Sequence, residues 1–187
     1  MALIEVRWHG RGGQGAWTAS NILAMAAAID GKYVQSFPAF GPERSGAPVL
    51  AFTRISEEPI EIHSMVYEPD IVVVLDPTLL KNVNVTQGLK KGGIIVVNYE
   101  GDVEKLYNNI GISKGEYKVY ITPATKLALE ILKRPITNTA MIGALLKASK
   151  LTSWESLEEA IKKRFPGPLA EKNIELVKKA YELAREV

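Results

Sequence analysis

Two runs of β-branched residues constrain the fold of this chain more than any other feature of its sequence. They span residues 70–76 and 93–98, where Val and Ile follow one another without alternating with polar residues. Such runs are typical of parallel strands covered on both faces, because both sides of the strand are then buried. The sequence therefore predicts an α/β fold with helices on both sides of a sheet.

Strands and helices alternate through the first two-thirds of the chain and give way to helices thereafter. We predict strands over residues 3–8, 32–37, 49–55, 70–76, 93–98 and 117–121, a further edge strand over 59–66, and a helix over 16–29. From residue 123 the periodicity is helical and predicts helices over 124–132, 138–149, 154–165 and 168–185. This order indicates a three-layer α/β/α sandwich with a mainly parallel sheet. We expect a single domain over residues 1–187, in which a helical C-terminal appendage (123–187) packs on a sheet core (1–122).

Composition excludes several classes of function. The net charge is only +2 and the lysines are interleaved with glutamates, so we expect no nucleic-acid partner. The longest apolar stretch, residues 22–29, is far shorter than the roughly 20 residues of a membrane-spanning helix, so we expect no membrane association. The chain has no cysteine, which rules out a cluster held by its own thiolates and fits a cytoplasmic location. Its two histidines, His9 and His63, are far apart, and we expect no metal site.

A glycine-rich loop follows the first predicted strand and precedes the first predicted helix. Its residues are Gly10, Arg11, Gly12, Gly13, Gln14 and Gly15, a G-x-G-x-x-G pattern. At such a place the helix N-terminus offers free N–H groups to an anion, and glycines let a phosphate approach the backbone. A dinucleotide site also needs an acidic residue at the end of the second strand, but that strand ends in Gln35, Ser36 and Phe37.

Three interpretations of this loop remain open. It forms an NAD site, or it makes only a tight turn between strand and helix, or it presents backbone donors to a partner chain or a phosphate-bearing ligand. We interpret His9 as a turn residue rather than a catalytic base. We also expect Gly12 to adopt a positive φ in the tight turn.

A second loop, residues 36–48, is predicted at the same edge of the sheet. It contains a charged pair, Glu43 and Arg44, followed by Ser45, among prolines that stiffen it. It also contains Phe37 and Phe40. Exposed aromatic rings in a loop indicate a docking surface, whereas rings that fold back over the sheet have no such role. Both possibilities stay open.

Together these segments resemble a known family. Residues 9–15 ahead of an Ala-rich helix, and residues 40–49, are similar to the gamma subunit of 2-oxoacid:ferredoxin oxidoreductases, of which pyruvate synthase is the best-known member. Residues 70–76, 88–93 and 138–145 also resemble that family, so the likeness runs in order along nearly the whole chain. It implies a non-catalytic subunit of a multimeric oxidoreductase. That enzyme converts a 2-oxoacid, with pyruvate expected first, to acyl-CoA and CO2 and passes the electrons to ferredoxin.

The resemblance also implies how the work is divided in the complex. Thiamine diphosphate, Mg²⁺ and 4Fe–4S clusters are expected in the alpha, beta and delta partner subunits, with none bound by this chain alone. The two loops are expected to face the active-site side, where Arg11 and Arg44 contact a phosphate of CoA or form intersubunit salt bridges. The candidate ligand or interface residues are Gly10, Arg11, Gly12, Gly13, Gln14, Gly15, Glu43, Arg44 and Ser45; no catalytic residue is expected. The alternatives are a stand-alone Rossmann-like nucleotide-binding enzyme and a structural module without a ligand.

Overall fold

The computed structural model describes residues 3–39 and 45–187 of the chain. Its elements are β1 (Ile4–Arg11), α1 (Ala16–Ile29), β2 (Tyr33–Pro38), β3 (Pro48–Ser56), β4 (Ile71–Val74), the 3-10 helix η1 (Pro77–Lys81), β5 (Ile94–Asn98), α2 (Val103–Ile110), β6 (Lys118–Thr122), α3 (Ala124–Leu132), α4 (Asn138–Ala148), α5 (Trp154–Arg164), α6 (Gly167–Leu183) and β7 (Arg185–Glu186). None of the helices in these two ranges is long and apolar enough to cross a membrane.

The strands form one seven-stranded sheet in the order β2-β3-β1-β4-β5-β6-β7. The central strands β1, β4, β5 and β6 are parallel, whereas β3, β2 and β7 pair antiparallel with their neighbours. The connection between β2 and β3 is too short for a crossover helix, so these two strands can pair only as antiparallel neighbours. The predicted α/β class is confirmed; its sheet is mixed, with parallel strands at the centre.

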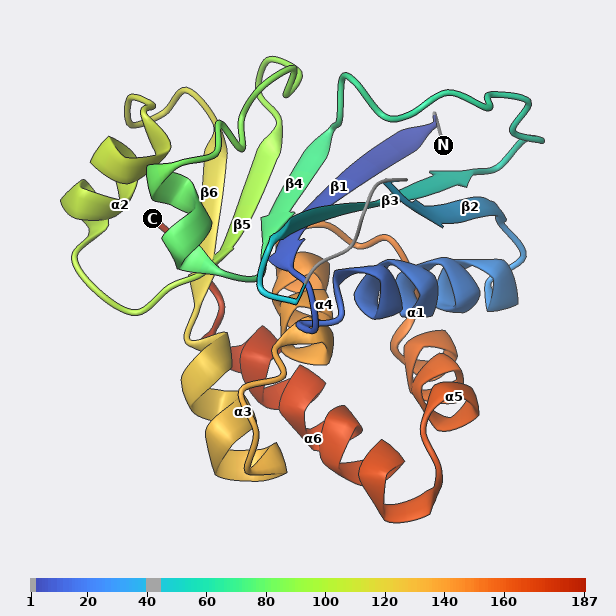
Figure 1. Ribbon diagram of the computed structural model, residues 1–187. Coiled ribbons are helices and arrows are strands. Elements are labelled where there is room, and N and C mark those ends of the chain that lie inside the picture. The colour runs from blue at the N-terminus through green and yellow to red at the C-terminus, as the bar shows by residue number, and fades with distance from the viewer. Residues whose placement is uncertain (1–2, 40–44) are drawn as a thin grey trace.

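Helices cover both faces of the sheet (Figure 1). The helices α1 and α3–α6 lie on one face, and η1 and α2 lie on the other. Successive side chains of β4 point alternately to the two sides: Ile71 and Val73 join the larger hydrophobic cluster, and Val72 and Val74 join the smaller one. Burial on both faces accounts for the uninterrupted apolar run in the sequence.

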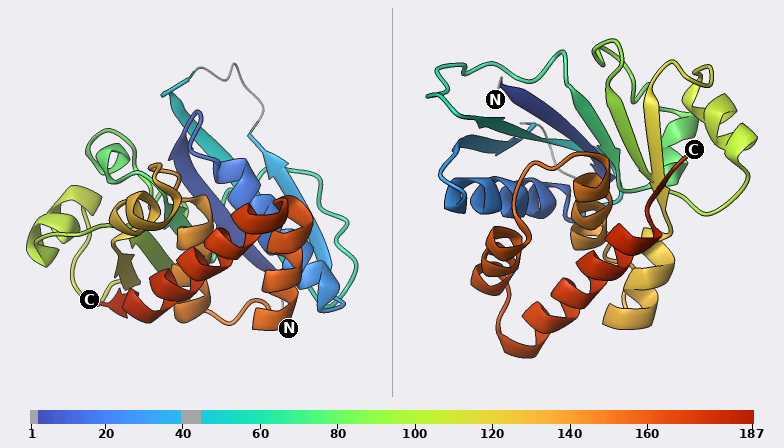
Figure 2. Two further views of the ribbon diagram at one scale, coloured as in Figure 1. Left: turned by 90° about the horizontal axis from the view of Figure 1, so that it is seen from below. Right: turned by 180° about the vertical axis from the view of Figure 1, so that it is seen from behind.

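The C-terminal helices form most of the layer beside α1 (Figure 2). Helix α4 is buried along residues 138–146 and packs against α6. Their backbones approach closely at Gly143, where a Cβ atom would overlap the carbonyl oxygen of Val177. The larger cluster contains side chains from the sheet and from α3–α6. The helical part thus packs on the sheet through a shared core.

Some of the expected secondary structure differs from the structure. The predicted edge strand over residues 59–66 is wrong: this segment is irregular. Side chains rather than a neighbouring strand bond three of its carbonyl groups. Gln35 Nε2 donates to Ile60 O and Ile62 O, and Arg54 Nη2 donates to Met65 O. Conversely η1, α2 and β7 were not predicted. Helix α2 does carry sequence signals, an Asp102 cap and a terminal Gly111 with φ of 79°.

Candidate functional site

The first two residues of the expected glycine loop, Gly10 and Arg11, are the last residues of β1, and the loop closes on itself through Gln14. The backbone N–H of Gln14 donates to Arg11 O (3.0 Å), and the N–H of Arg11 donates to Gln14 Oε1 (2.7 Å). Gly13, the third residue of this turn, has φ of 92°, which matches the type II pattern that favours glycine. Gly15 has φ of 80° and caps α1. The expected positive φ at Gly12 is wrong, because Gly13 and Gly15 make the left-handed steps.

The two loops lie side by side at the carboxyl end of β1, as predicted. Gly12 N donates to Ala47 O (2.9 Å) and Gly46 N donates to Gly12 O (3.1 Å), so Gly12 and Ser45 form a parallel bridge. Among the candidate residues, this geometry brings together Gly10, Arg11, Gly12, Gly13, Gln14, Gly15 and Ser45. Glu43 and Arg44 lie outside the described residues.

Of the two phenylalanines expected in the second loop, Phe37 belongs instead to β2, opposite Phe52 of β3. Its ring centroid lies 5.2 Å from that of Phe52, and the Arg54 guanidinium lies 5.3 Å from it. Phe40 lies outside the described residues. Phe37 is therefore a half-buried part of the sheet rather than a ring exposed on the loop.

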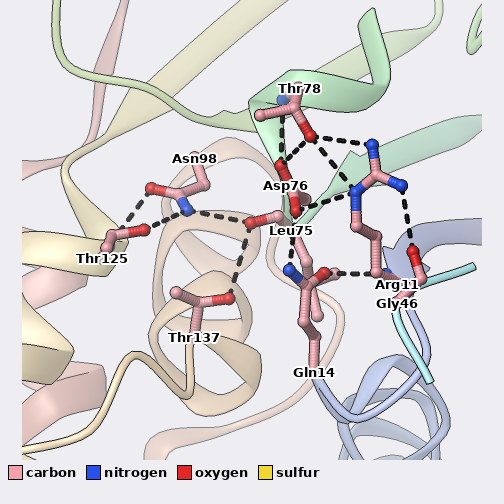
Figure 3. A network of polar contacts seen from close by, with 9 residues as sticks. All are labelled: Arg11, Gln14, Gly46, Leu75, Asp76, Thr78, Asn98, Thr125 and Thr137. Atoms are coloured by element: carbon pink, nitrogen blue, oxygen red, sulfur yellow. Dashed lines mark hydrogen bonds and ion pairs between the residues drawn. The ribbon is translucent and has the colours of Figure 1, made fainter. Parts of the chain in front are cut away.

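Asp76, just after β4, contacts Gln14 and Arg11, and Arg11 in turn donates to the second loop at Gly46 O (Figure 3). Its Oδ2 accepts from Gln14 Nε2 (2.7 Å) and lies 3.3 Å from Arg11 Nε. Its Oδ1 accepts from the N–H (2.9 Å) and the hydroxyl (2.7 Å) of Thr78. Arg11 also donates to Thr78 Oγ1 (3.0 Å) and Gly46 O (3.0 Å). We call Arg11, Gln14, Asp76 and Thr78 the Asp76 cluster.

The Asp76 cluster keeps its carboxylate charged. Burial by itself would raise the pKa of Asp76, but hydrogen bonds from Thr78 and Gln14 and the charge of Arg11 outweigh it and lower that pKa. Sequence reasoning missed the roles of Asp76 and Thr78. The available signal was position: Asp76 ends a predicted parallel strand, and such strand ends meet at one edge of the sheet.

A second polar network continues along this edge (Figure 3). Asn98, at the end of β5, donates through Nδ2 to Leu75 O (2.8 Å) and to Thr125 Oγ1 (2.8 Å). Its Oδ1 accepts from Thr125 N (3.2 Å), and the hydroxyl of Thr137 donates to Leu75 O (3.5 Å). The ends of β4 and β5 are thereby joined to the starts of α3 and α4, so the glycine loop rests on a fixed framework.

The outer side of the glycine loop is open. A cavity of about 300 Å³ lies between the loop, the first turn of α1 and β3; it is lined by residues that include Gly13, Gly15 and Thr18. Gly15 supplies no side-chain cap to α1. Nearby, Trp17 is 52% exposed. Uncapped N–H groups at a helix N-terminus, with an arginine next to them, can bind an anion.

His9 is neither a turn residue nor placed as a base of this loop. It lies within β1, opposite Leu50 and Val74, and is 4% exposed. Burial and the charge of Arg7 lower the pKa of His9 to about 3, so its ring is neutral. In residues 3–39 and 45–187, no three acidic or histidine side chains are grouped to hold a metal ion.

Comparison with known proteins gives consistent matches over nearly the whole length. A family model described as "Pyruvate ferredoxin/flavodoxin oxidoreductase" matches residues 5–183. The "Pyruvate/ketoisovalerate oxidoreductases common subunit gamma" of Pyrococcus furiosus is 58% identical over 180 residues, which cover 96% of each chain. The "Pyruvate synthase subunit PorC" of Methanothermobacter thermautotrophicus is 51% identical over 96% of this chain and 95% of that protein.

Solved structures agree with these matches. The crystal structure of pyruvate oxidoreductase subunit PORC from Thermotoga maritima superposes with a TM-score of 0.86 at 40% identity, over 98% of this chain and 97% of that one. A chain of the 2-oxoglutarate:ferredoxin oxidoreductase from Magnetococcus marinus shares the fold, with a TM-score of 0.74 at 22% identity. This chain is covered to 97% and that chain to 31%, so the same fold occurs there within a longer polypeptide.

Proposed function

The chain belongs to the pyruvate ferredoxin/flavodoxin oxidoreductase family, and we propose that it is the gamma subunit of a complex that oxidises a 2-oxoacid with ferredoxin as electron acceptor. The observation that carries this proposal is coverage: relatives named as gamma or PorC subunits match 96% of the chain and at least 95% of their own length. A stand-alone nucleotide-binding enzyme finds no support among these relatives.

The proposed reaction joins a 2-oxoacid and CoA to give acyl-CoA and CO2, with two electrons passed to ferredoxin. This chain has no cysteine and so offers no thiolate to an iron–sulfur cluster. We assign the clusters, the thiamine diphosphate and its Mg²⁺ to alpha, beta and delta subunits in a cytoplasmic complex. The role left to this chain is to complete the assembly and to position a substrate.

Pyruvate is the first substrate we propose, with branched-chain 2-oxoacids second. The relative in Pyrococcus furiosus is named as common to pyruvate and ketoisovalerate oxidoreductases. A subunit shared between two such enzymes cannot be what distinguishes their substrates. We therefore place the choice of 2-oxoacid in the partner subunits.

The glycine loop is where we propose that this chain meets its partners and CoA. Its support is geometric: uncapped N–H groups of α1 and a cavity of about 300 Å³ lie beside Arg11, whose side chain is 29% exposed. A phosphate of CoA would match the positive end of the helix dipole. Asp76 and Thr78 would then act by holding Arg11 and Gln14 in position. The second loop, with Ser45, would complete the surface.

Purification of the tagged chain from its native cells tests the assembly. We expect native mass spectrometry to find it with alpha, beta and delta chains, thiamine diphosphate and iron. The same chain produced alone should be colourless and inactive with pyruvate, CoA and a viologen acceptor. Turnover by the isolated chain, or recovery of the chain alone with a bound nicotinamide cofactor, would contradict the proposal.

Arg11→Met in the reconstituted complex tests the loop. If Arg11 contacts a phosphate of CoA, the KM for CoA should rise about tenfold, the equivalent of about 1.4 kcal/mol, while the KM for the 2-oxoacid holds. If Arg11 instead faces a partner chain, the complex should dissociate at lower salt with KM for CoA unchanged. Arg164→Met removes the same charge from an exposed site on α5 and serves as the control. No change in either assay would refute both roles of Arg11.

A further inference from the structure

A second cavity lies on the other face of the sheet from α1. It has a volume of about 270 Å³ and lies between β1, β3 and the segment that follows η1. Leu50, Leu79 and Val83 give it an apolar side, and Arg7 and His9 from β1 give it a polar one. It adjoins the cavity at the N-terminus of α1, because Val49 and Leu50 of β3 line both, but Arg7 and His9 line only this one.

Arg7 carries a buried charge without a counter-ion. The residue is 7% exposed; its Nη2 donates to Val85 O (2.9 Å) and Gln87 O (2.6 Å), and its Nε donates to His9 Nε2 (3.1 Å). No carboxylate in the described part of the chain pairs with it. Burial lowers the pKa of Arg7, yet a guanidinium stays protonated in proteins.

A second buried arginine on the same face of the sheet, Arg54, differs from Arg7 because it has a carboxylate partner. Arg54, on β3, is also buried, and its Nε lies 2.8 Å from Glu5 Oε1. Buried charges in proteins are normally paired in this way, because an unpaired charge loses its hydration without compensation. Of these two buried arginines, Arg54 has a carboxylate partner and Arg7 has none among the described residues.

The bond from Arg7 fixes the tautomer of His9. A guanidinium only donates, so His9 Nε2 must be the unprotonated acceptor, and the proton of the neutral ring is on Nδ1. Neither His9 Nδ1 nor Arg7 Nη1 has a hydrogen-bond partner among the described residues. No buried side-chain polar atom in that part of the chain is unsatisfied, so both groups reach accessible space. Both residues line this cavity.

We propose that this cavity binds a small monocarboxylate, with its carboxylate on Arg7 Nη1 and His9 Nδ1 and its apolar body against Leu50, Leu79 and Val83. The net charge of the donors is +1, which a monoanion neutralises. A phosphate dianion would leave a negative charge among apolar side chains, at a high desolvation cost. The volume, smaller than that of most drug-sized sites, suits an acid of a few carbon atoms. This assignment does not depend on the chain being part of a complex.

Histidine NMR of the full-length chain tests the proposal. The chain has two histidines, so ¹⁵N-histidine labelling gives one buried reporter, His9, and one exposed reference, His63. We expect the free protein to show His9 as the neutral Nδ1–H tautomer. Isobutyrate, titrated against sodium chloride at constant ionic strength, should shift the His9 signals with saturation and leave those of His63 unchanged. Absence of a saturable shift, or parallel shifts of both histidines, would overturn the proposal.

Two variants and one competing anion sharpen the result. Arg7→Met should weaken isobutyrate binding at least tenfold, whereas Arg164→Met, with the same loss of charge at an exposed position, should not. Val83→Phe, which keeps Arg7 and fills the cavity, should weaken binding as well and covers the case in which Arg7→Met does not fold. Unaltered binding in Val83→Phe would place the anion elsewhere. Tighter binding of inorganic phosphate than of isobutyrate would refute the monocarboxylate assignment.

Discussion

Gly15 shows how one residue sets the geometry of the glycine loop. Its φ of 80° is left-handed, and a Cβ atom there would lie 2.7 Å from Asn138 Nδ2. Asn138 is buried at the start of α4, where its Oδ1 accepts from Thr139 N (2.8 Å). The loop thus touches the C-terminal helices at a point where a Cβ atom would force the Asn138 side chain to move. The left-handed conformation and this contact both favour glycine here.

Gly15→Ala should therefore destabilise the fold more than Gly31→Ala. Gly31 has nearly the same φ, 84°, but a Cβ there meets nothing within 4 Å, so it measures the conformational strain alone. We expect Gly31→Ala to cost about 1 kcal/mol and Gly15→Ala about 2–3 kcal/mol in urea unfolding. Adding Asn138→Ala to Gly15→Ala should recover part of the loss. Equal losses in the two single variants would show that Asn138 adjusts freely.

The glycine loop was predictable as a strand-to-helix turn, but its internal geometry was not. The sequence places glycines between a strand and a helix, and that suffices for the turn and for its closeness to residues 45–47. Which glycines take a positive φ depends on the hydrogen bonds between Gln14 and Arg11. The pattern of glycines in the sequence does not predict these bonds. Likewise, Arg7 and His9 face a cavity only because β1 runs between β3 and β4.

At the scale of elements, Asp30 joins the end of α1 to the start of α5. Its Oδ1 accepts from the hydroxyls of Ser153 (2.8 Å) and Ser156 (2.6 Å), and its Oδ2 accepts from Thr152 Oγ1 (2.6 Å) and Ser153 N (2.9 Å). Burial would raise the pKa of Asp30, but the hydrogen bonds from Ser156, Thr152 and Ser153 outweigh it and lower the pKa to about 2. The ionised carboxylate thus holds the N-terminal turn of α5 against α1.

Asp30→Asn should destabilise the chain, with a defined pH dependence. A carboxyl whose pKa falls on folding stabilises the protein above its unfolded pKa, 3.8, and loses that effect as the pH falls toward 2. Because Asp30 is exposed, solvent screening limits the effect to about 1 kcal/mol, or about 2–4 °C in Tm at pH 7. The Tm difference from the parent should close between about pH 4 and 2. Glu171→Gln, which neutralises an exposed carboxylate on α6, should show no comparable effect; an equal loss there would point to general charge instead.

The strength of the sequence signal differs between elements. The buried central strands and the C-terminal helices have strong patterns, and the predicted ranges 70–76, 93–98 and 124–132 contain β4, β5 and α3. Residues 59–66 resemble an edge strand in composition, but Gln35 and Arg54 take up several of the carbonyl groups that a ladder would use. The two-residue β7 depends on its partner β6 and has no local pattern. The irregular path of residues 59–66 and the pairing of β7 both depend on contacts with residues distant in the sequence, so a local pattern cannot predict them.

For the whole molecule, the shared core indicates that the sheet and the helical part are stable only together. Trp8 of β1, Leu145 of α4 and Val177 of α6 belong to one cluster of buried side chains. Thr122, at the end of β6, also donates to Ala180 O (3.1 Å) in α6. We infer that residues 1–122 and 123–187 form one cooperative unit.

Urea unfolding of a Trp17→Phe/Trp154→Phe variant tests this cooperativity. Its remaining tryptophan, Trp8, is fully buried in the sheet and reports on that part by fluorescence. Circular dichroism at 222 nm follows the helices, most of which lie beyond residue 122. The two probes should give the same midpoint and the same m-value. Separate midpoints would show that the helical part unfolds independently of the sheet.

The last strand has a consequence for how the protein behaves at high concentration. Without β7, the outer edge of β6 would expose unpaired N–H and C=O groups, the template on which sheets of different molecules join and aggregate. Arg185 and Glu186 occupy this edge with charged side chains, and Val187 is held by Val119 O (2.9 Å) and the Tyr107 hydroxyl (2.8 Å). Removal of residues 185–187 should therefore reduce solubility before it reduces stability.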